Sequence, residues 1–264
     1  MTKKPRKFTI TEPLPIASKV VKSAVRTIQL LECFDDLQCG LTLMEISQEL
    51  GIPQSSTSEL LRSLVTIGYL EFERSTRTYR PTLRISLLGR WINPDFGARG
   101  PTLTLLQQLS EHTGETIVLA SRHGSYSQYI HVIQSKMSPD FHMALGSVRP
   151  LVRSGTGYAL LADLPKEAIL RILIRSNAEK VTGEHLVSQS EFFARLEEVR
   201  SRGYAFTHDL VRRGSAIIAM ALPHLEGQQK LAVGVGGSRK NLQKKQQEII
   251  EVMKKGIFDC KTQC

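Results

Sequence analysis

The stretch LTLMEISQELGIPQSSTSELLRSLVTIGYLEFERSTRTYR, residues 41–80, decides the fold of the first part of this chain. Thr42 and Glu45 have the spacing of a capping box, in which a hydroxyl and a carboxylate satisfy backbone amides at a helix start. Gly51 can close that helix in the left-handed conformation, and Pro53 is tolerated in the first turn of the next helix. The sequence therefore predicts two helices separated by a tight turn.

The segments on either side of these helices complete a known kind of module. The second helix is expected to end at Gly68, and Tyr69 to Pro81 is typical of a β-hairpin. Upstream, Ser18 to Phe34 predicts a first helix. Its apolar residues near helical spacing are Val21, Val25, Ile28 and Leu31. Three helices and a hairpin form a winged helix-turn-helix, which places its last helix in a major groove while the wing follows the sugar-phosphate backbone.

The last helix of this module carries different side chains on its two faces. Leu61, Leu64 and Val65 fall on one face, which must pack on the other helices. On the opposite face, Gln54 can bond an adenine bidentately, and Arg62 can contact guanine or a phosphate. Small polar side chains are often merely solvated, but the capping box, turn and wing in register favour DNA contact. The predicted DNA-binding residues are Thr42, Gln54, Ser55, Ser56, Thr57, Ser58, Arg62, Arg74 and Arg77.

Charges modify this surface in two ways. The Glu59 carboxylate repels phosphates unless it accepts from a cytosine amino group or pairs with Arg62. In the wing, Arg74, Arg77 and Arg80 supply positive charge, for which phosphate contact is the natural role.

The composition of the whole chain suits a polyanionic partner without establishing one. Lysine and arginine number 35 against 25 acidic residues, a net charge of +10. Residues 1–17 are expected to form a basic flexible arm, which either seeks phosphates or is a solvated tail. Both alternatives fit its composition.

Several classes of protein are disfavoured by what the sequence lacks. No apolar run approaches the roughly 18 residues of a membrane span, and the basic start leads into no hydrophobic signal segment. The cysteine pairs Cys33/Cys39 and Cys260/Cys264 lack zinc-finger spacing, so we expect reduced thiols, no metal, no cofactor and a cytoplasmic location. The seven histidines accompany no nucleophile elbow or zinc motif, which argues against an enzyme.

The C-terminal part alternates short β-like runs with helices. Strands are expected at 116–120, 129–133, 204–206, 216–222 and 230–235, and helices at 102–112, 157–162, 166–174, 191–202 and 243–255. This alternation predicts an α/β or α+β domain. We therefore expect a winged helix-turn-helix at 18–82, a linker helix at 83–98 and a second domain at 99–264.

Short segments in a fixed order carry a family resemblance. They are SAVRTIQLL (23–31), LTLMEI (41–46), GIPQSS (51–56), GYL (68–70), GET (114–116), GYALLA (157–162), VRSRGYA (199–205), Gly214 and VGVGGSR (233–239). Together they resemble the isocitrate-lyase-regulator (IclR) family of bacterial transcription factors. The resemblance runs from Ser18 to the last helix, which is nearly the whole chain.

The resemblance implies an α+β protein with an N-terminal winged helix-turn-helix, a linker helix and a C-terminal mixed α/β effector-binding domain of the GAF type. Such proteins are typically dimers or tetramers that bind pseudo-palindromic double-stranded DNA operators and respond to a small, often carboxylate-bearing effector. Dimers also make physical sense, because paired half-sites multiply the affinity. The family usually has other side chains at Gln54, Ser58 and Glu59, so its operator sequences cannot be transferred.

The resemblance also implies an effector site, over the loop that opens a helix at residues 153–157. Glycines there let backbone amides approach an anion, although an ordinary tight helix start has the same sequence. The family usually has serines at Gly234 and Gly236 and a cysteine at Ile217, and Phe141 lies on a strand that would close the pocket. The predicted effector-binding residues are Phe141, Arg153, Ser154, Gly155, Thr156, Thr207, His208, Ile217, Gly234 and Gly236.

These departures lead to a hypothesis about function. Two glycines in place of serines remove hydroxyls and add room, so we expect an effector larger or more apolar than a two- or three-carbon acid, such as an aromatic carboxylate. Arg153 either holds the acid group or points into a subunit contact. We predict a sequence-specific transcriptional regulator, activator or repressor, controlled by this effector. The alternative is a DNA-binding oligomer with a vestigial, ligand-free second domain.

Overall fold

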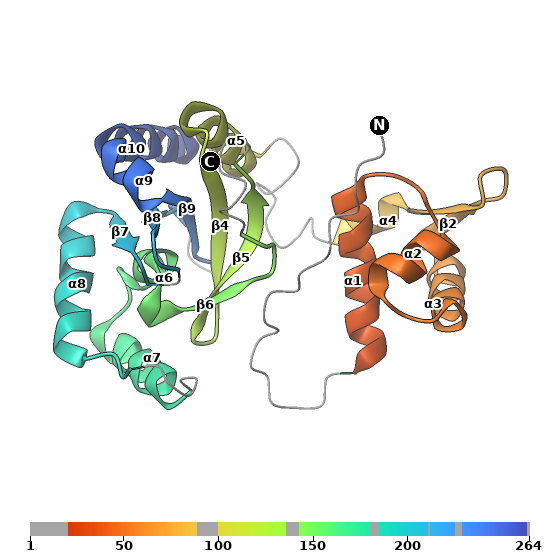
Figure 1. The fold of residues 1–264 in the computed structure, drawn as a ribbon, viewed down its shortest axis with the longest axis horizontal. Helices are drawn as coiled ribbons and strands as arrows, with labels where there is room; N and C mark the ends of the chain where they lie inside the picture. The colour runs from red at the N-terminus through yellow and green to blue at the C-terminus, as the bar shows by residue number, and fades with distance from the viewer. Residues whose placement is uncertain are drawn as a thin grey trace. The chain divides into compact units, whose positions relative to one another are not determined.

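The computed structural model describes residues 21–88, 100–135, 143–179, 185–210, 212–224 and 229–262 (Figure 1). The chain divides into two compact units, and their described residues end at 88 in the N-terminal unit and begin at 100 in the C-terminal unit. The expected basic arm, most of the expected linker helix and Phe141 lie outside the described residues. No described helix is long and apolar enough to cross a membrane.

The N-terminal unit is a winged helix-turn-helix, as the sequence predicts. Its elements are α1 (Lys22–Leu37), β1 (Leu41–Thr42), α2 (Leu43–Leu50), α3 (Gln54–Thr66), β2 (Leu70–Glu73), β3 (Thr78–Pro81) and α4 (Leu83–Leu88). The strands pair antiparallel in the order β1-β3-β2, so the short β1 extends the wing hairpin into a small sheet.

The predicted capping box at the start of α2 and the predicted turn between α2 and α3 are both present. The amide of Glu45 donates to the Thr42 hydroxyl at 3.3 Å, and the amide of Thr42 donates to the Glu45 carboxylate at 2.8 Å. Gly51 ends α2 at φ 62°, in the region that glycine adopts without strain. Pro53 lies at the N-cap of α3, one position before the first helical turn where the sequence placed it. The local sequence therefore determines where α2 ends and where α3 begins.

Packing of α1 differs from the sequence pattern. The buried apolar residues of the unit are Leu30, Cys33, Phe34, Leu41, Ile46, Leu61, Leu64 and Leu70. In contrast, Val21, Val25 and Ile28 are 65 %, 37 % and 56 % exposed. Apolar residues lie on two faces of α1, and the other helices cover only the face that carries Leu30 and Phe34. An apolar row on α1 therefore faces solvent.

The C-terminal unit is a six-stranded sheet with helices on both faces. Its elements are α5 (Pro101–Thr113), β4 (Thr116–His123), β5 (Tyr126–Ile133), β6 (Val148–Pro150), the short 3-10 helix η2 (Leu151–Arg153), α6 (Gly155–Leu161), α7 (Lys166–Ala178), α8 (Gln189–Arg202), β7 (Ala205–His208), β8 (Ser215–Ala221), β9 (Leu231–Ser238), α9 (Arg239–Lys244) and α10 (Gln246–Thr262). All neighbouring strands are antiparallel, in the order β6-β5-β4-β9-β8-β7. With the winged helix-turn-helix, the protein is of the α+β class.

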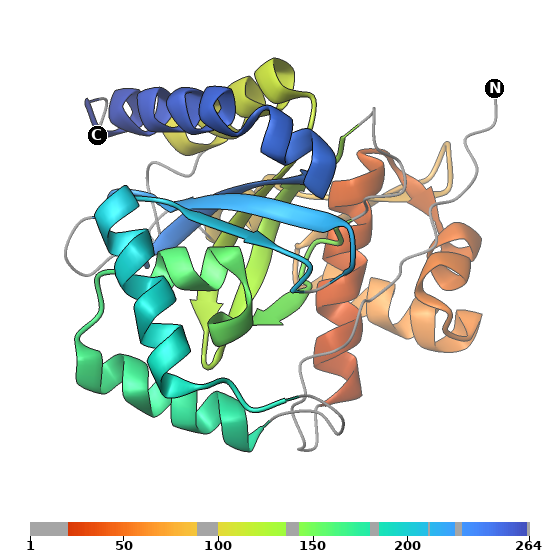
Figure 2. The same ribbon diagram turned by 60° about the vertical axis from the view of Figure 1, so that its left-hand side comes forward.

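The two faces of the sheet carry separate cores because successive strand residues point to opposite sides. On β4, Ile117 and Leu119 pack with α5, α9 and α10, whereas Val118 and Ala120 join a smaller cluster on the other face. Around α6, a further core includes Tyr158, Phe192 and Ala219. Figure 2 shows α5 and α10 on one side of the sheet and α6 and α8 on the other. The predicted site residues near α6 therefore belong to the α6 side.

Some short elements were not predicted from the sequence. They are β1, β6, η2 and α9. The start of α9 has a recognisable cap, since the Ser238 hydroxyl accepts from the Asn241 amide at 3.2 Å. The helix expected at 243–255 begins at Gln246, directly after α9. Elements of a few residues give too little periodicity to be predicted without such a cap.

Candidate nucleic-acid interface and effector site

Helix α3 divides the predicted DNA-binding residues between an outer and an inner face. Gln54, Ser55 and Arg62 are exposed, while Ser56 and Ser58 are half-buried. Thr57 is fully buried, and its hydroxyl donates to the Pro53 carbonyl at 3.1 Å. Thr57 therefore lies with the core leucines, and the structure does not bring it to the outer surface.

The exposed outer row of α3 contains Glu59 and Arg62, the two charged residues that were predicted to lie on this face. Ser55, Glu59 and Arg62 are all exposed and follow at helical spacing. No ion pair joins Glu59 to another described residue, and Arg62 likewise pairs with none. The guanidinium of Arg62 is therefore available to a base edge or a phosphate.

Thr42 serves the fold at the start of α2. Its hydroxyl accepts from the Glu45 amide and donates to the Glu45 carboxylate at 2.8 Å. Hydrogen bonds from the backbone and side chain of Thr42 lower the pKa of Glu45. The polar atoms of Thr42 are thus already used in the cap.

The wing presents its arginines in an ordered turn between β2 and β3. Glu73 accepts from the Ser75 amide at 3.0 Å and from the Ser75 hydroxyl at 2.8 Å, and these bonds lower its pKa. Arg74 and Arg77 are exposed, and Arg77 takes a left-handed φ of 53°. The turn therefore projects two guanidiniums from the tip of the wing.

The predicted effector residues at the start of α6 are brought against β7 and β8. The Ser154 hydroxyl caps α6 by accepting from the Gly157 amide at 3.1 Å. A Cβ at Gly155 would lie 2.7 Å from Cγ2 of Ile217 and 2.9 Å from Oγ1 of Thr207. The structure thus places Ser154, Gly155, Thr207 and Ile217 together.

Gly234 of β9 does not add the room that the sequence suggested. Ile217 pairs with Gly236 across the sheet, and both are buried. A Cβ at Gly234 would lie 2.7 Å from Cδ1 of Ile217 and 2.9 Å from Cγ2 of Val118. The Ile217 side chain therefore occupies the space in front of Gly234, so the room expected at that glycine is filled.

Thr156 joins a buried polar group on the same face. Its hydroxyl lies 2.8 Å from the Ser127 hydroxyl of β5. Burial raises the pKa of the neighbouring Tyr129, while Arg149 and a hydrogen bond with Thr156 lower it in part. Sequence reasoning missed Ser127 and Tyr129, because a strand pattern does not say which residues meet α6.

His208 lies away from these residues. Its ring is 6.0 Å from that of Phe206, which packs against the core beside α5 and α10. Its Nδ1 lies 3.1 Å from the Asp209 carboxylate, which also accepts from the Gly214 amide at 2.6 Å and from Arg239 at 2.7 Å. Alternation along β7 turns Thr207 toward α6 and His208 toward the opposite face.

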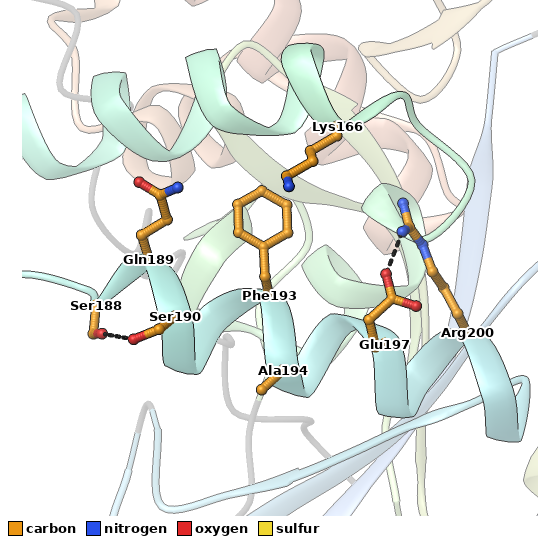
Figure 3. A pocket seen from close by; sticks show the side chains of 8 residues that line it. All are labelled: Lys166, Ser188, Gln189, Ser190, Phe193, Ala194, Glu197 and Arg200. Carbon is orange, nitrogen blue, oxygen red and sulfur yellow. Dashed lines mark hydrogen bonds and ion pairs between the residues drawn. The ribbon is translucent and has the colours of Figure 1, made fainter.

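On the α6 side of the C-terminal unit, the described residues line two hollows that bear on the site. The larger, of about 740 Å³, lies between α7 and α8 and contains no predicted site residue (Figure 3). Within it, Arg200 donates to Glu197 at 2.6 Å and to the Ala162 carbonyl at 2.6 Å, while Lys166 lies 5.7 Å from the Phe193 ring centre. Arg200 therefore ties α8 to the end of α6.

Arg153 lines the smaller hollow. This cavity of about 150 Å³ also has Tyr158, Arg195 and Phe192 in its lining. The guanidinium of Arg153 donates to the His185 carbonyl. Arg153 thus lines a hollow whose lining does not include Ile217.

A winged helix-turn-helix is a DNA-binding module, so the fold of the N-terminal unit places the protein among DNA-binding proteins. The family model described as IclR helix-turn-helix domain matches residues 23–74, and that described as Bacterial transcriptional regulator IclR C-terminal matches residues 100–257. The chain belongs to the IclR family, whose members are DNA-binding transcriptional regulators and not enzymes.

Curated relatives are similar over most of their length. HTH-type transcriptional repressor AllR of Escherichia coli is 27 % identical over 86 % of this chain and 84 % of its own. Transcriptional repressor IclR of the same organism is 25 % identical, covering 84 % and 81 %. HTH-type transcriptional regulator XynR is 24 % identical, covering 76 % and 80 %.

Solved structures share the fold. The Thermotoga maritima IclR has a TM-score of 0.63 at 18 % identity, covering 91 % of this chain and 98 % of that one. An IclR homolog from Microbacterium hydrocarbonoxydans, crystallised with 4-hydroxybenzoate, has a TM-score of 0.61 at 17 % identity, covering 91 % and 98 %.

Proposed function

We propose that this regulator is a homodimer or a homotetramer that reads a pseudo-palindromic operator and whose affinity for that operator is set by a small carboxylate effector. In this proposal residues 18–82 read DNA, 83–98 link the domains and 99–264 sense the effector.

The outer row of α3 is the observation that carries operator reading. Ser55, Glu59 and Arg62 face outward at helical spacing, while Thr57 and Leu61 face the core. This orientation leaves hydrogen-bonding side chains on the surface that a helix-turn-helix presents to base edges. Arg74 and Arg77 at the tip of the wing suit phosphates.

The uncovered row on α1 supports dimerisation. Val21, Val25 and Ile28 lie at helical spacing and are all exposed, although β-branched apolar side chains gain from burial. A second copy offers the same row, as a two-fold interface requires. Two modules on one duplex also bind two half-sites, which multiplies affinity.

The effector class is supported by one relative. The Microbacterium hydrocarbonoxydans homolog was crystallised with an aromatic acid, 4-hydroxybenzoate. In this chain the packing of Ile217 against Gly234 favours a second candidate, a regulator whose sheet face near α6 holds no ligand. An effector of the first candidate then needs either movement of Ile217 or another cavity.

Selection from random duplexes with the purified full chain tests the proposed function. We expect enrichment of one sequence with two-fold symmetry, and a shift in its affinity when benzoate is added. Arg62→Ala is the matched variant, and it should enrich the same site weakly. Failure of the full chain to enrich any sequence contradicts operator reading, whereas enrichment insensitive to every small acid favours the ligand-free candidate.

A further inference from the structure

The smaller cavity of the C-terminal unit combines an aromatic wall with guanidinium groups. Its volume is about 150 Å³, and Arg153, Tyr158, Phe192 and Arg195 are among its lining residues. A cavity on the order of 150 Å³ is known to hold one benzene ring. The space therefore suits a single ring or a short chain.

The aromatic wall is rigid. The rings of Tyr158 and Phe192 stack with centres 5.3 Å apart, and their exposed fractions are 2 % and 1 %. Leu186 and Leu210 add apolar surface. Tyr158 and Phe192 both line the cavity and are held in place by their stack, so they give it an apolar wall with little exposed ring surface.

Arg195, like Arg171 of α7, takes no part in the ion pairs that other arginines of α7 and α8 make with described residues. On α7 and α8, Arg175 pairs with Glu179 at 2.7 Å, Arg200 with Glu197 at 2.6 Å and Arg202 with Glu198 at 3.8 Å. No such pair joins Arg195 to a carboxylate of the described residues, although Glu191 lies one helical turn before it and lines the same cavity. A guanidinium kept out of the local ion pairs is suited to an external carboxylate.

We propose that this cavity binds a small monocarboxylate, with the acid group held by Arg195 and the Tyr158 hydroxyl and the apolar part against Phe192. Arg153 adds a second guanidinium to the described lining, which also contains the carboxylate of Glu191. The proposal deepens the proposed function by giving the effector its place, and it rests on that function for the effect on DNA.

The protonation of Tyr158 suits this role. Burial raises the pKa of its hydroxyl, and the charge and hydrogen bond of Arg195, with the charge of Arg153, lower it only in part. The hydroxyl is therefore protonated at neutral pH. A hydroxyl that accepts from a guanidinium keeps its own proton, which Tyr158 can donate to a carboxylate oxygen.

Calorimetric titration of the full chain with benzoate tests the site. We expect benzoate to bind and its neutral analogue benzamide to bind at least about tenfold more weakly, because a hydrogen bond to a charged group is stronger than a neutral one. Arg195→Gln should weaken benzoate about tenfold or more, and Tyr158→Phe by about threefold. The matched control is Arg171→Gln, at an exposed position of α7, which should bind as the unchanged chain does.

Several results overturn the inference. They are no binding of benzoate by the unchanged chain, equal binding of inorganic phosphate, or an affinity that changes in Ile217→Val but not in Arg195→Gln. If Arg195→Gln fails to fold by circular dichroism, Arg195→Lys keeps the charge without the planar fork and should still bind several-fold more weakly. Full affinity in Arg195→Lys then counts against carboxylate recognition by the fork.

The inference and the proposed function fail separately. Benzoate that binds through Arg195 without changing operator affinity leaves the site standing and removes its role as an effector site. Operator reading by a chain that does not bind benzoate leaves the regulator standing and removes the site. Each measurement is made on the same full chain.

Discussion

The surface of α3 and the sheet face beside α6 were both predicted as binding sites, and they differ in how far one element determines them. On α3 a single helical period decides that Arg62 faces out and Leu61 faces in. On the sheet, Gly234 lacks a side chain, but Ile217 of the neighbouring strand fills the space that this leaves. A surface made by one helix can be derived from its own sequence, whereas a site made by several strands depends on their register.

Substitution of a packed glycine gives the largest expected loss of stability. Comparing it with substitution of an unpacked glycine separates the cost of a clash with another element from the cost of backbone strain. A Cβ at Gly157 would lie 2.1 Å from the Leu151 carbonyl oxygen, so Gly157→Ala must displace η2 or α6. We expect a loss of about 3 kcal/mol or more in the stability of the C-terminal unit. Native-state hydrogen exchange of the full chain measures this by region.

Gly51→Ala is the matched control in the N-terminal unit. Gly51 has φ 62° and no atom within 4 Å of a built Cβ, so only backbone strain opposes the change. We expect a cost of about 1 kcal/mol, confined to residues 21–88. Equal losses for the two variants contradict the distinction between packed and local glycines.

The sequence predicted the N-terminal unit well where the cause is local. The capping box at Thr42, the stop at Gly51 and the inward leucines of α3 are all present. The exposed row at Val21 and Ile28 was not distinguished from the core row at Leu30 and Phe34, because α1 is apolar on both faces. Only packing against the other helices chooses between them.

In the C-terminal unit the strands were predicted better than the site. The runs that became β4, β8 and β9 are visible as apolar segments. Which face each residue takes depends on strand alternation and pairing, and this separates Thr207 from its neighbour His208. The cavity beside Tyr158 joins residues distant in sequence, so no local pattern marks it.

Removal of the Arg62 guanidinium tests the surface of α3, whose outward residues were predicted from the sequence of that helix alone. Arg62→Ala should weaken the selected operator by about 1–3 kcal/mol while leaving random DNA nearly unchanged. Electrophoretic mobility shifts on both duplexes measure the difference, with Arg171→Ala as the control. A loss that is equal on the two duplexes assigns Arg62 to a phosphate instead of a base.

The buried carboxylate of Glu115 tests the packing of the C-terminal unit, which depends on contacts between elements distant in sequence. Glu115 is 5 % exposed, and its Oε2 has no hydrogen-bond partner among the described residues. Burial raises its pKa, and Lys245 and Asn241 lower it only in part. Because the folded pKa exceeds the unfolded value, the stability that Glu115 contributes is present in acid and is lost as pH rises through the folded pKa.

Glu115→Gln should therefore stabilise the C-terminal unit at neutral pH, by about 1 kcal/mol. The gain should shrink below the ordinary glutamate pKa, where the unchanged side chain is protonated in both states. Thermal unfolding across pH measures this, with Glu251→Gln on the exposed side of α10 as the control. A variant that is less stable at every pH would show that the carboxylate has a structural partner.

The smallest loss of DNA affinity is expected at the tip of the wing, where the charge of Arg77 matters more than the exact place of its side chain. Arg77→Ala should weaken the operator and random DNA alike and lower the slope of log affinity against log salt by about 1. Arg77 has φ 53°, and alanine carries a Cβ as arginine does, so the substitution leaves the backbone strain of the turn nearly unchanged. Arg77→Lys separates the positive charge from the planar guanidinium, because lysine keeps the charge without the planar group. Recovery of the salt slope in Arg77→Lys supports a phosphate contact, and failure to recover it assigns the role to the planar guanidinium.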